Sequence, residues 1–397
     1  MNEEQKIEIG NSLYIMLSTQ NQMVNYIPLK YFGFQNILNI TTDDDKNENW
    51  DKNFQKVLEE ELPFISFKYK ELTNIENLKE RLSDNETIEN ASSIFWNITG
   101  GQRPFVLAVY DLVKELEDKT HYLCYLEGNS GQMQIMKFEK GIQDIQNFDG
   151  NNLDYKLNEN ELNLKIALQL MGYNIPKLPQ NLQKGGFDEE KEFYNKFYPI
   201  YKEHPSIPVS LTKSNQNGSD LDVIIDELNL PQTSSLTKEE IKIFWSKYKN
   251  KKSFGYILED MAICLLLKAI EKNPIIKSQL IGLYASTKIN HMSHTSNEII
   301  DEFDIIILTK HGQILNFECK SGKMTGDVAK STNYSTYAIS GVYGLPILIT
   351  PMVKEDSNKI NDKITKAIAA AERAKLPVWH LNEIANKLKE HLNNNHV

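Results

Sequence analysis

The sequence predicts an α/β protein made of two lobes joined by a connector. Two alternations of strand-like and helix-like segments support this class, one in the N-terminal third and one after residue 236. The length of 397 residues is about twice that of a usual domain. A hydrophobic fraction of 40% supplies enough apolar side chains for two cores. We therefore expect a first domain over 1–140, a connector or minor subdomain over 141–236 and a second domain over 237–397.

Five short apolar runs of the first domain predict strands, and the amphipathic segments between them predict helices. Strands that alternate with helices of about a dozen residues form βαβ units around a parallel sheet. Ligands of such sheets bind at the carboxyl ends of the strands. The predicted strands are Ser12–Leu17, Asn36–Thr42, Pro63–Tyr69, Ser92–Thr99 and His121–Glu127.

The second domain is also predicted to alternate. Thr237 and Glu240 form a capping box that opens a helix, and an apolar helix is expected over Gly255–Lys272. Two strands then follow, separated by a hairpin-length turn that contains Gly312. Further on, a buried strand, a helix, a short strand and a closing helix complete the α/β pattern. The predicted strands are Glu302–Thr309, Ile314–Lys320, Pro346–Thr350 and the run PVWHL.

Composition narrows the class of protein. The chain has 3 cysteines and no CxxC pair, so neither a disulfide framework nor a structural zinc site is expected. The N-terminus is acidic and polar, unlike a signal peptide, and the apolar runs are too short to span a membrane. We expect a cytoplasmic protein with no membrane partner.

The strand pair of the second domain carries the most informative chemistry. Side chains alternate along a strand, so Glu318 and Lys320 share one face, and the preceding antiparallel strand can place Asp304 beside Glu318. Acids within apolar strands need a compensating cation, and a hard divalent ion such as Mg²⁺ or Mn²⁺ would satisfy both. Lys320 could then orient or help deprotonate the attacking water and stabilise charge on a phosphate. The plainer alternative is an exposed hairpin with an ordinary salt bridge.

Polar loops at the strand ends of the first domain indicate a ligand site. The run from Thr99 to Arg103 lies between a strand and a helix, where free backbone N–H groups and a guanidinium attract anions. It is neither a Walker A loop nor a GxGxxG fingerprint. Turn and capping chemistry explains any one such loop, but several at one edge favour a nucleotide. The candidate ligand-binding residues are Ser18, Thr19, Gln20, Asn21, Thr41, Thr42, Thr99, Gly100, Gly101, Gln102, Arg103, Gly128 and Asn129.

These motifs resemble two known families. Asp304 followed by Glu318-x-Lys320 is similar to the PD-(D/E)XK nuclease core, and Glu259 in the run GYILE matches its additional helix acid. The loops STQN, NITTDDD and NITGGQR resemble those of the CARF domain, the Rossmann-like sensor of CRISPR-associated proteins. Together they resemble the ancillary nucleases of type III CRISPR systems.

The resemblance implies a homodimer that binds cyclic oligoadenylate, typically cyclic tetra-adenylate, across its sensor pair. It also implies metal-dependent cleavage of single-stranded RNA and DNA, or nicking of duplex DNA. Glu259, Asp304 and Glu318 would be the metal ligands, with Lys320 as the fourth catalytic residue. Lys323, Lys330, Tyr334 and Tyr337 follow this core and suit single-stranded nucleic acid, although a solvated helix whose tyrosines pack on the sheet is an alternative for each.

Two other functions share parts of this pattern. A constitutive restriction or repair endonuclease would need no activator, and a non-enzymatic nucleotide sensor would keep a degenerate nuclease lobe as an interaction surface. The net charge of −10 first argues against a nucleic-acid partner. Residues 241–397, however, hold 21 basic and 15 acidic residues, a net charge of +6, against 23 and 39, a net charge of −16, in residues 1–240. The half that carries the nuclease motif is therefore the basic half.

Overall fold

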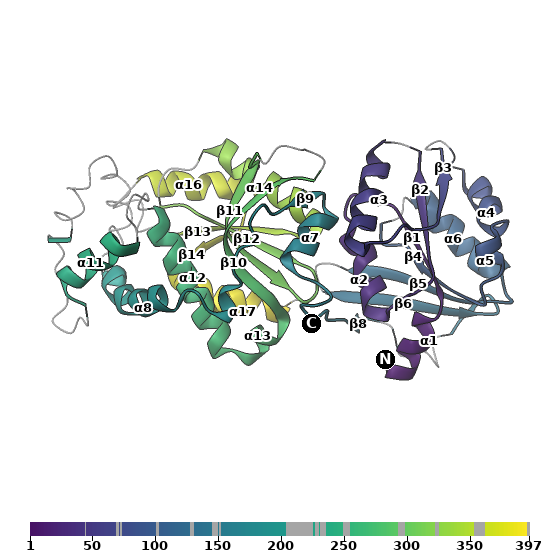
Figure 1. Ribbon diagram of the computed structural model, residues 1–397, viewed down its shortest axis with the longest axis horizontal. Coiled ribbons are helices and arrows are strands. Elements are labelled where there is room, and N and C mark those ends of the chain that lie inside the picture. The colour runs from purple at the N-terminus through teal and green to yellow at the C-terminus, as the bar shows by residue number, and fades with distance from the viewer. Residues whose placement is uncertain are drawn as a thin grey trace.

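The computed structural model describes residues 1–43, 45–68, 71, 74–100, 103–127, 131–144, 150, 152–203, 225–226, 230, 236–248, 255–292, 298–321, 325–352 and 362–394. Two lobes lie side by side, each built around its own β-sheet (Figure 1). We call residues 1–154 the N-terminal lobe and residues 173–394 the C-terminal lobe. The α/β two-domain class expected from the sequence is confirmed.

The sheet of the N-terminal lobe has the order β3-β2-β1-β4-β5-β6-β7, with β8 paired to β6. Its first five strands are parallel, and β6, β7 and β8 extend it in antiparallel fashion. The strand order reverses between β1 and β4, which makes the crevice between their carboxyl ends the expected ligand position. The strands are β1 (Leu13–Leu17), β2 (Ile37–Thr42), β3 (Phe64–Phe67), β4 (Ser93–Asn97), β5 (Thr120–Glu127), β6 (Gln132–Glu139), β7 (Ile142–Gln143) and β8 (Leu153–Asp154).

Helices cover both faces of this sheet. One face packs against α4, α5 and α6, through buried residues such as Leu78 and Phe105. The other face packs against α1, α2 and α3, through residues such as Ile9 and Phe54. The helices are α1 (Glu3–Gly10), α2 (Met23–Phe32), α3 (Asp45–Leu58), α4 (Ile75–Ser83), α5 (Glu86–Glu89) and α6 (Arg103–Glu115).

The sheet of the C-terminal lobe has the order β14-β13-β12-β11-β10-β9. The pairs β9–β10, β10–β11 and β11–β12 are antiparallel, whereas the pairs β12–β13 and β13–β14 are parallel. The carboxyl ends of these last three strands therefore lie at one edge. The strands are β9 (Tyr173–Asn174), β10 (Leu280–His291), β11 (Asp301–Thr309), β12 (Ile314–Cys319), β13 (Leu345–Thr350) and β14 (Val378–His380).

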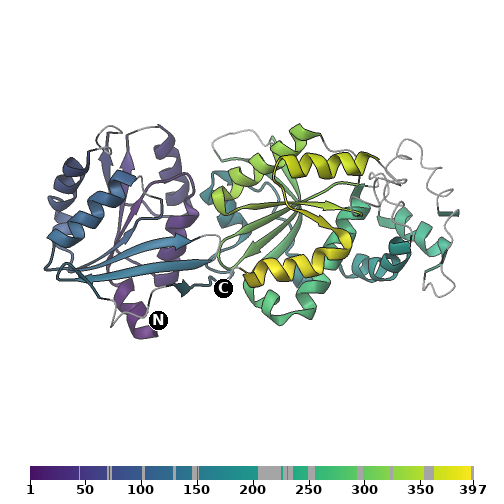
Figure 2. The ribbon, with the colours of Figure 1, turned by 180° about the vertical axis from the view of Figure 1, so that it is seen from behind.

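The helices of the C-terminal lobe also form two layers (Figure 2). On one face α12 and α17 bury Leu258 and Leu388 against Ile305 and Phe317. On the other face α14 and α16 bury small side chains around Leu348. The helices are α7 (Leu164–Leu170), which joins the lobes, then α8 (Asp188–Glu203), α11 (Lys238–Tyr248), α12 (Gly255–Lys272), α13 (Pro274–Gln279), α14 (Gly326–Ser340), α16 (Asp362–Arg373) and α17 (Ile384–Asn394), with the 3₁₀ turns η2 (Leu182–Lys184), η3 (Gly341–Tyr343) and η4 (Leu381–Glu383).

The two lobes share part of one hydrophobic core. Ile27 of α2 belongs to the same buried cluster as Ile306 and Leu308 of β11. Gly312, in the turn after β11, has a φ of +83°, and a Cβ there would lie 2.9 Å from the Ile27 Cδ1 atom. The Tyr155 hydroxyl adds a hydrogen bond of 2.9 Å to the carbonyl of His311. A helix that begins beside the ligand crevice is thus packed directly on the strands of the other lobe.

Strand β10, residues 280–291, is the main element that sequence patterning did not predict. Its run LIGLYASTKINH lacks strict alternation, and both Leu283 and Tyr284 are buried because helices and the N-terminal lobe cover opposite faces. The predicted capping box is present, with the Glu240 N–H donating to the Thr237 Oγ1 over 3.2 Å. In the part of the chain that the structure describes, no helix is long and apolar enough to cross a membrane.

Candidate functional site

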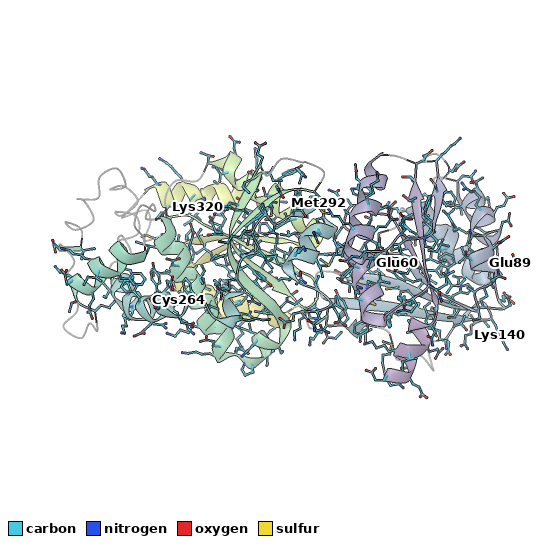
Figure 3. The ribbon with its side chains drawn as sticks, in the orientation of Figure 1. Glu60, Glu89, Lys140, Cys264, Met292 and Lys320 are labelled. Atoms are coloured by element: carbon cyan, nitrogen blue, oxygen red, sulfur yellow. The ribbon has the colours of Figure 1, made fainter. Side chains whose placement is uncertain are left out.

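Asp304 and Glu318 lie next to each other on neighbouring strands. Ile305 of β11 pairs with Phe317 of β12 in the antiparallel ladder. In the same register, Asp304, which precedes Ile305, lies opposite Glu318, which follows Phe317, and both side chains are on the same side of the sheet. Because β12 starts at the turn that contacts α2, its carboxyl end and Lys320 lie at the edge away from the N-terminal lobe (Figure 3).

Hydrogen bonds and charges tie this cluster together. The Asp304 Oδ2 atom accepts a hydrogen bond of 2.8 Å from the backbone N–H of Cys319. The Lys320 ammonium forms an ion pair with the Glu318 carboxylate, and their side chains are only 31% and 17% exposed. Burial lowers the pKa of Lys320, but the charges of Glu318 and Asp304 outweigh burial and raise it. Lys320 is therefore held as a cation against the carboxylates.

Asp304 carries an unfavourable charge. Burial, and then the negative charge of Glu318, raise the pKa of Asp304 to about 6, although Lys320 and the Cys319 N–H act in the opposite sense. The site thus holds two carboxylates and a single ammonium, all largely shielded from solvent. Such a set of oxygen donors with excess negative charge suits a hard divalent cation. Asp304 and Glu318 accordingly fit the role of ligands for Mg²⁺ or Mn²⁺.

Glu259 comes from the opposite side of this strand end, on α12. Burial raises the pKa of the Cys319 thiol, and the charges of Asp304 and Glu259 add to that rise. The neighbouring Asp260 accepts a hydrogen bond of 2.9 Å from the Tyr194 hydroxyl, which fixes α12 against α8. Within the described ranges, no group of three or more His, Cys, Asp or Glu side chains is arranged to hold a metal. The structure thus brings Asp304, Glu318 and Lys320 together and places Glu259 within electrostatic range of Cys319, the residue between Glu318 and Lys320.

The raised pKa of Asp304 predicts a pH-dependent stability effect. Because this pKa is about 6 in the folded chain and 3.8 normally, folding is penalised above pH 6 and the penalty disappears as pH falls through this window. Asp304→Asn keeps an acceptor for the Cys319 N–H and removes the charge. In EDTA at pH 8, we expect the variant to gain about 1–2 kcal/mol of unfolding free energy over the parent.

Denaturant unfolding of both proteins at pH 4 and pH 8 measures this effect. The difference between variant and parent should be near zero at pH 4, where the carboxyl is protonated, and should reach its full size at pH 8. An equal difference at both values would mean that the charge of Asp304 carries no penalty.

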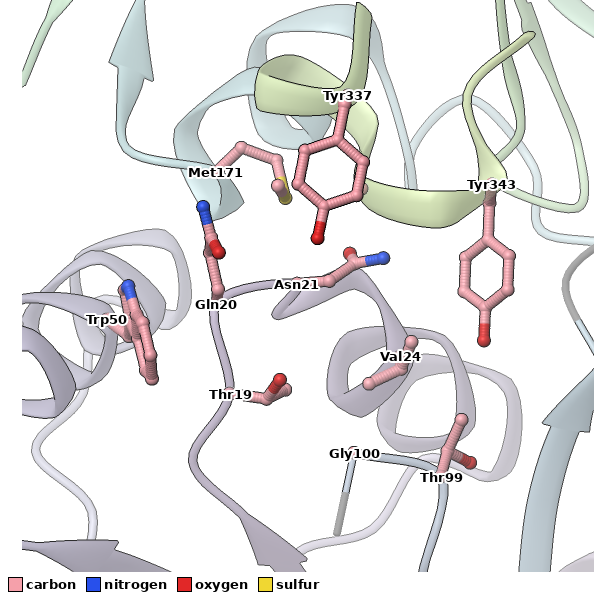
Figure 4. A pocket seen from close by; sticks show the side chains of 11 residues that line it. Thr19, Gln20, Asn21, Val24, Trp50, Thr99, Gly100, Met171, Tyr337 and Tyr343 are labelled. Carbon is pink, nitrogen blue, oxygen red and sulfur yellow. The ribbon is translucent and has the colours of Figure 1, made fainter. Parts of the chain in front are cut away.

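A second candidate site lies where the strand order reverses in the N-terminal sheet. The loops after β1 and β4 line a cavity of about 320 Å³ that also borders on the C-terminal lobe (Figure 4). This is the crevice in which sheets of this topology hold ligands. Its lining residues are Thr19, Gln20, Asn21, Val24, Trp50, Thr99, Gly100, Met171, Tyr337, Gly341 and Tyr343.

A buried amide network fixes the two loops of this cavity. The Asn97 Nδ2 atom donates to the Asn25 Oδ1 and to the Val24 carbonyl, both over 2.9 Å. The Asn25 Nδ2 atom donates in turn to the Leu17 carbonyl and the Gln22 Oε1, again over 2.9 Å. Hydrogen bonds between amides are strong in a low-dielectric core, so this network restricts the side chains of Asn25 and Asn97. It holds the end of β1, the start of α2 and the end of β4 in one arrangement.

The predicted ligand residues divide into those that line the cavity and those that do not. Thr19, Gln20, Asn21, Thr99 and Gly100 line it. A Cβ on Gly100 would lie 2.9 Å from the Thr19 Cγ2, so the two loops approach closely there.

The remaining predicted residues have other positions. Ser18 is buried beside the cavity, and its hydroxyl has no hydrogen-bond partner within the described part of the chain. Thr41 donates instead to Asp51 over 2.6 Å, and neither it nor Thr42 is among the lining residues. Arg103 is exposed at the first residue of α6. Four predicted positions lie outside the described residues: Gly101, Gln102, Gly128 and Asn129.

The structure adds cavity residues that sequence reasoning missed. Trp50 comes from α3, Met171 from the end of α7, and Tyr337, Gly341 and Tyr343 from α14 and η3 of the other lobe. Tyr337 was expected beside the nuclease motif, and it instead faces the loops of the N-terminal lobe (Figure 4). No local sequence pattern places these distant segments at one cavity.

The fold and the cavity define a two-lobed α/β protein with a polar cavity at the strand ends of its N-terminal sheet. No protein-family model and no curated protein matches the chain. Among solved structures, the Vibrio cholerae protein VC1899 has a TM-score of 0.63 at 13% identity, covering 96% of this chain and 97% of that one. Can2 from Sulfobacillus thermosulfidooxidans, solved in complex with cyclic tetra-adenylate, has a TM-score of 0.61 at 14% identity, covering 98% and 99%.

A third solved structure shares the fold over part of its length. It is a type III CRISPR defence DNA nuclease activated by cyclic oligoadenylate, with a TM-score of 0.50 at 12% identity. The match covers 86% of this chain and 45% of that one. At these identities the similarity establishes a common two-lobed α/β fold.

Proposed function

We propose that this chain is a cyclic oligoadenylate-activated, metal-dependent nuclease of type III CRISPR defence. In this proposal residues 1–140 form a CARF sensor, 237–397 form a PD-(D/E)XK nuclease domain and 141–236 connect them. The observation that carries the proposal is the presence of two distinct sites in one chain. One is the polar cavity at the switch point of a parallel sheet, and the other is the Asp304, Glu318 and Lys320 cluster at a strand end. The whole-chain fold similarity to Can2 in its cyclic tetra-adenylate complex supports the activator.

The activator would bind at the cavity of the N-terminal lobe. Asn21 and Thr99 offer groups for base edges and ribose, and Arg103 with the N-terminus of α6 offers donors for phosphates. A ring of nucleotides is larger than one cavity of about 320 Å³, so two protomers around a twofold axis would share it. We therefore expect a homodimer, with cyclic tetra-adenylate as the activator.

The catalytic cluster would hydrolyse a phosphodiester. Asp304 and Glu318 would hold Mg²⁺ or Mn²⁺, with Glu259 as the third candidate ligand, and the ion would supply Lewis-acid stabilisation of the scissile phosphate. The Lys320 ammonium would donate to a phosphate oxygen as water adds to phosphorus and the bond to the leaving oxygen breaks. The net charge of +6 over residues 241–397 favours a nucleic-acid substrate at this lobe, and we expect single-stranded RNA or DNA.

A cleavage assay tests this function. Labelled RNA, single-stranded DNA and supercoiled plasmid are each incubated with the chain and Mn²⁺ or Mg²⁺, with and without the tri-, tetra- and hexa-adenylate rings. We expect cleavage only when both a ring and a metal are present, and none in EDTA. Cleavage at the same rate with and without the cyclic oligoadenylates would favour a constitutive endonuclease. Ring binding without any cleavage would favour a non-enzymatic sensor.

A further inference from the structure

Residues of the C-terminal lobe form one wall of the cavity in the N-terminal lobe. Tyr337 of α14 and Tyr343 of η3 lie across the cavity from Asn21 and Val24 (Figure 4). The Tyr343 hydroxyl donates to the Leu126 carbonyl over 3.1 Å, which anchors this wall to β5. Tyr337 remains 47% exposed, with its ring on the cavity side.

Asn21 faces this wall with an unsatisfied side chain. Both its Oδ1 and its Nδ2 are buried, and neither has a hydrogen-bond partner among the residues that the structure describes. The backbone of Gly341, at a φ of +61°, comes so close that a Cβ there would lie 2.5 Å from the Asn21 Nδ2. A buried amide without a partner is costly, and a ligand that supplies a donor and an acceptor removes that cost.

An aromatic ring and an amide at one cavity match the chemistry of a purine base. Aromatic side chains stack on the face of an unpaired base, while amides read its edge through paired hydrogen bonds. Tyr337 offers the ring and Asn21 offers the donor and acceptor. The two groups belong to different lobes, so a base held between them contacts both lobes at once.

Tyr337 also lies on α14, a helix that is hydrogen-bonded to β12, the strand that carries Glu318. The next residue back, Thr336, accepts a hydrogen bond of 2.8 Å at its Oγ1 from the Asn316 Nδ2. Asn316 is on β12, two residues before Glu318, and its side chain shares a face with that carboxylate. Helix α14 itself begins at Gly326, shortly after Lys320. The cavity residue Tyr337 is therefore connected to β12 in two ways, along the chain that leads from β12 to α14 and through the hydrogen bond between Asn316 and Thr336.

We propose that Tyr337 is an activator-binding residue supplied by the nuclease lobe, which stacks on a base while Asn21 reads its edge. This inference rests on the proposed function and adds a direct contact between the activator and the helix bonded to the catalytic strand. Binding that moves α14 at Tyr337 would then move the strand that carries Glu318 and Lys320, and the differential affinity for the two positions of α14 would drive activation.

Titration calorimetry with cyclic tetra-adenylate tests the contact in the full chain. We expect Tyr337→Ala to weaken binding about 10-fold, since base stacking contributes on the order of 1–3 kcal/mol, and Tyr337→Phe to bind like the parent. Tyr334→Ala is the matched control, because Tyr334 lies one turn earlier on α14, is 74% exposed and does not line the cavity. Thermal melting of each variant checks folding.

The outcomes separate this inference from the proposed function. Parental affinity in Tyr337→Ala, or an equal loss in Tyr337→Ala and Tyr334→Ala, would overturn the inference while binding by the parent still supports an oligoadenylate sensor. Absence of binding by the parent to every ring would overturn the proposed function and the inference with it. A selective loss in Tyr337→Ala, with a matching rise in the ring concentration needed for half-maximal cleavage, would establish the contact.

Discussion

Glu318→Ala is expected to reduce metal-dependent cleavage by about 10³-fold or more while leaving the affinity for cyclic tetra-adenylate unchanged. Glu318 faces Asp304 across the β11–β12 ladder and holds the Lys320 ammonium. Its removal takes away an oxygen ligand and releases that ammonium from its position. The activator cavity is formed by other segments, so binding should persist.

Single-turnover cleavage of labelled RNA or DNA at saturating activator measures this effect, with calorimetry for binding. Glu318→Gln keeps the shape of the side chain and should be similarly impaired, which separates loss of charge from loss of packing. Glu390→Ala, an exposed acid on α17 paired with Lys387, controls for the change in net charge and should cut at the parental rate. Parental cleavage by Glu318→Ala would show that the catalytic assignment is wrong.

Arg103→Glu is expected to weaken cyclic tetra-adenylate binding by about 100-fold, because charge-assisted hydrogen bonds to phosphate contribute on the order of 1.5–3 kcal/mol and reversal adds repulsion. Arg103 is exposed at the first residue of α6, next to the loop that supplies Thr99 and Gly100. The catalytic cluster lies in the other lobe, so the cleavage rate at saturating activator should match the parent.

Lys114→Glu is the matched control for this variant. Lys114 is exposed in the last turn of the same helix, where its ammonium lies 4.0 Å from the centre of the Tyr110 ring. It makes the same change in net charge far from the cavity. Equal weakening in both variants would mean that the effect comes from overall charge, and no weakening in Arg103→Glu would remove this residue from the activator site.

Glu318→Ala and Arg103→Glu are expected to impair different steps. Glu318→Ala should bind the activator and not cut, whereas Arg103→Glu should cut at the parental rate once enough activator is present. That contrast distinguishes a catalytic residue from an activator-binding residue without reference to any other protein.

Local pattern was enough to predict most elements of the fold. The five strands of the parallel sheet and the pair that carries Asp304 and Glu318 fall close to the predicted ranges, because each has a continuous apolar run bounded by turn residues. Strand β10 was missed because it is covered on both sides by different partners, which removes the alternation that marks a half-covered strand.

The candidate sites could be predicted less completely from the sequence than the helices and strands. Asp304, Glu318 and Lys320 could be predicted to converge, since a hairpin and a period of two bring them to one face. Thr41 illustrates the opposite case, because its hydroxyl is directed to Asp51 on α3 and not to the cavity. The loops after β1 and β4 were predicted as a site, but the wall that Tyr337 supplies could not be, since it lies more than 100 residues from Asn21 in the sequence.

Three properties follow from the amino-acid sequence alone: the α/β class, the proximity of the three charged catalytic candidates, and the division into an acidic and a basic half. These properties depend on neighbours along the chain or on one hairpin. Three others require the folded chain: the contribution of the C-terminal lobe to the cavity, the raised pKa of Asp304, and the position of the Asn21 amide, which has no partner among the described residues. Those properties depend on side chains brought together by packing of the two lobes, and packing between distant segments leaves no periodic trace in the sequence.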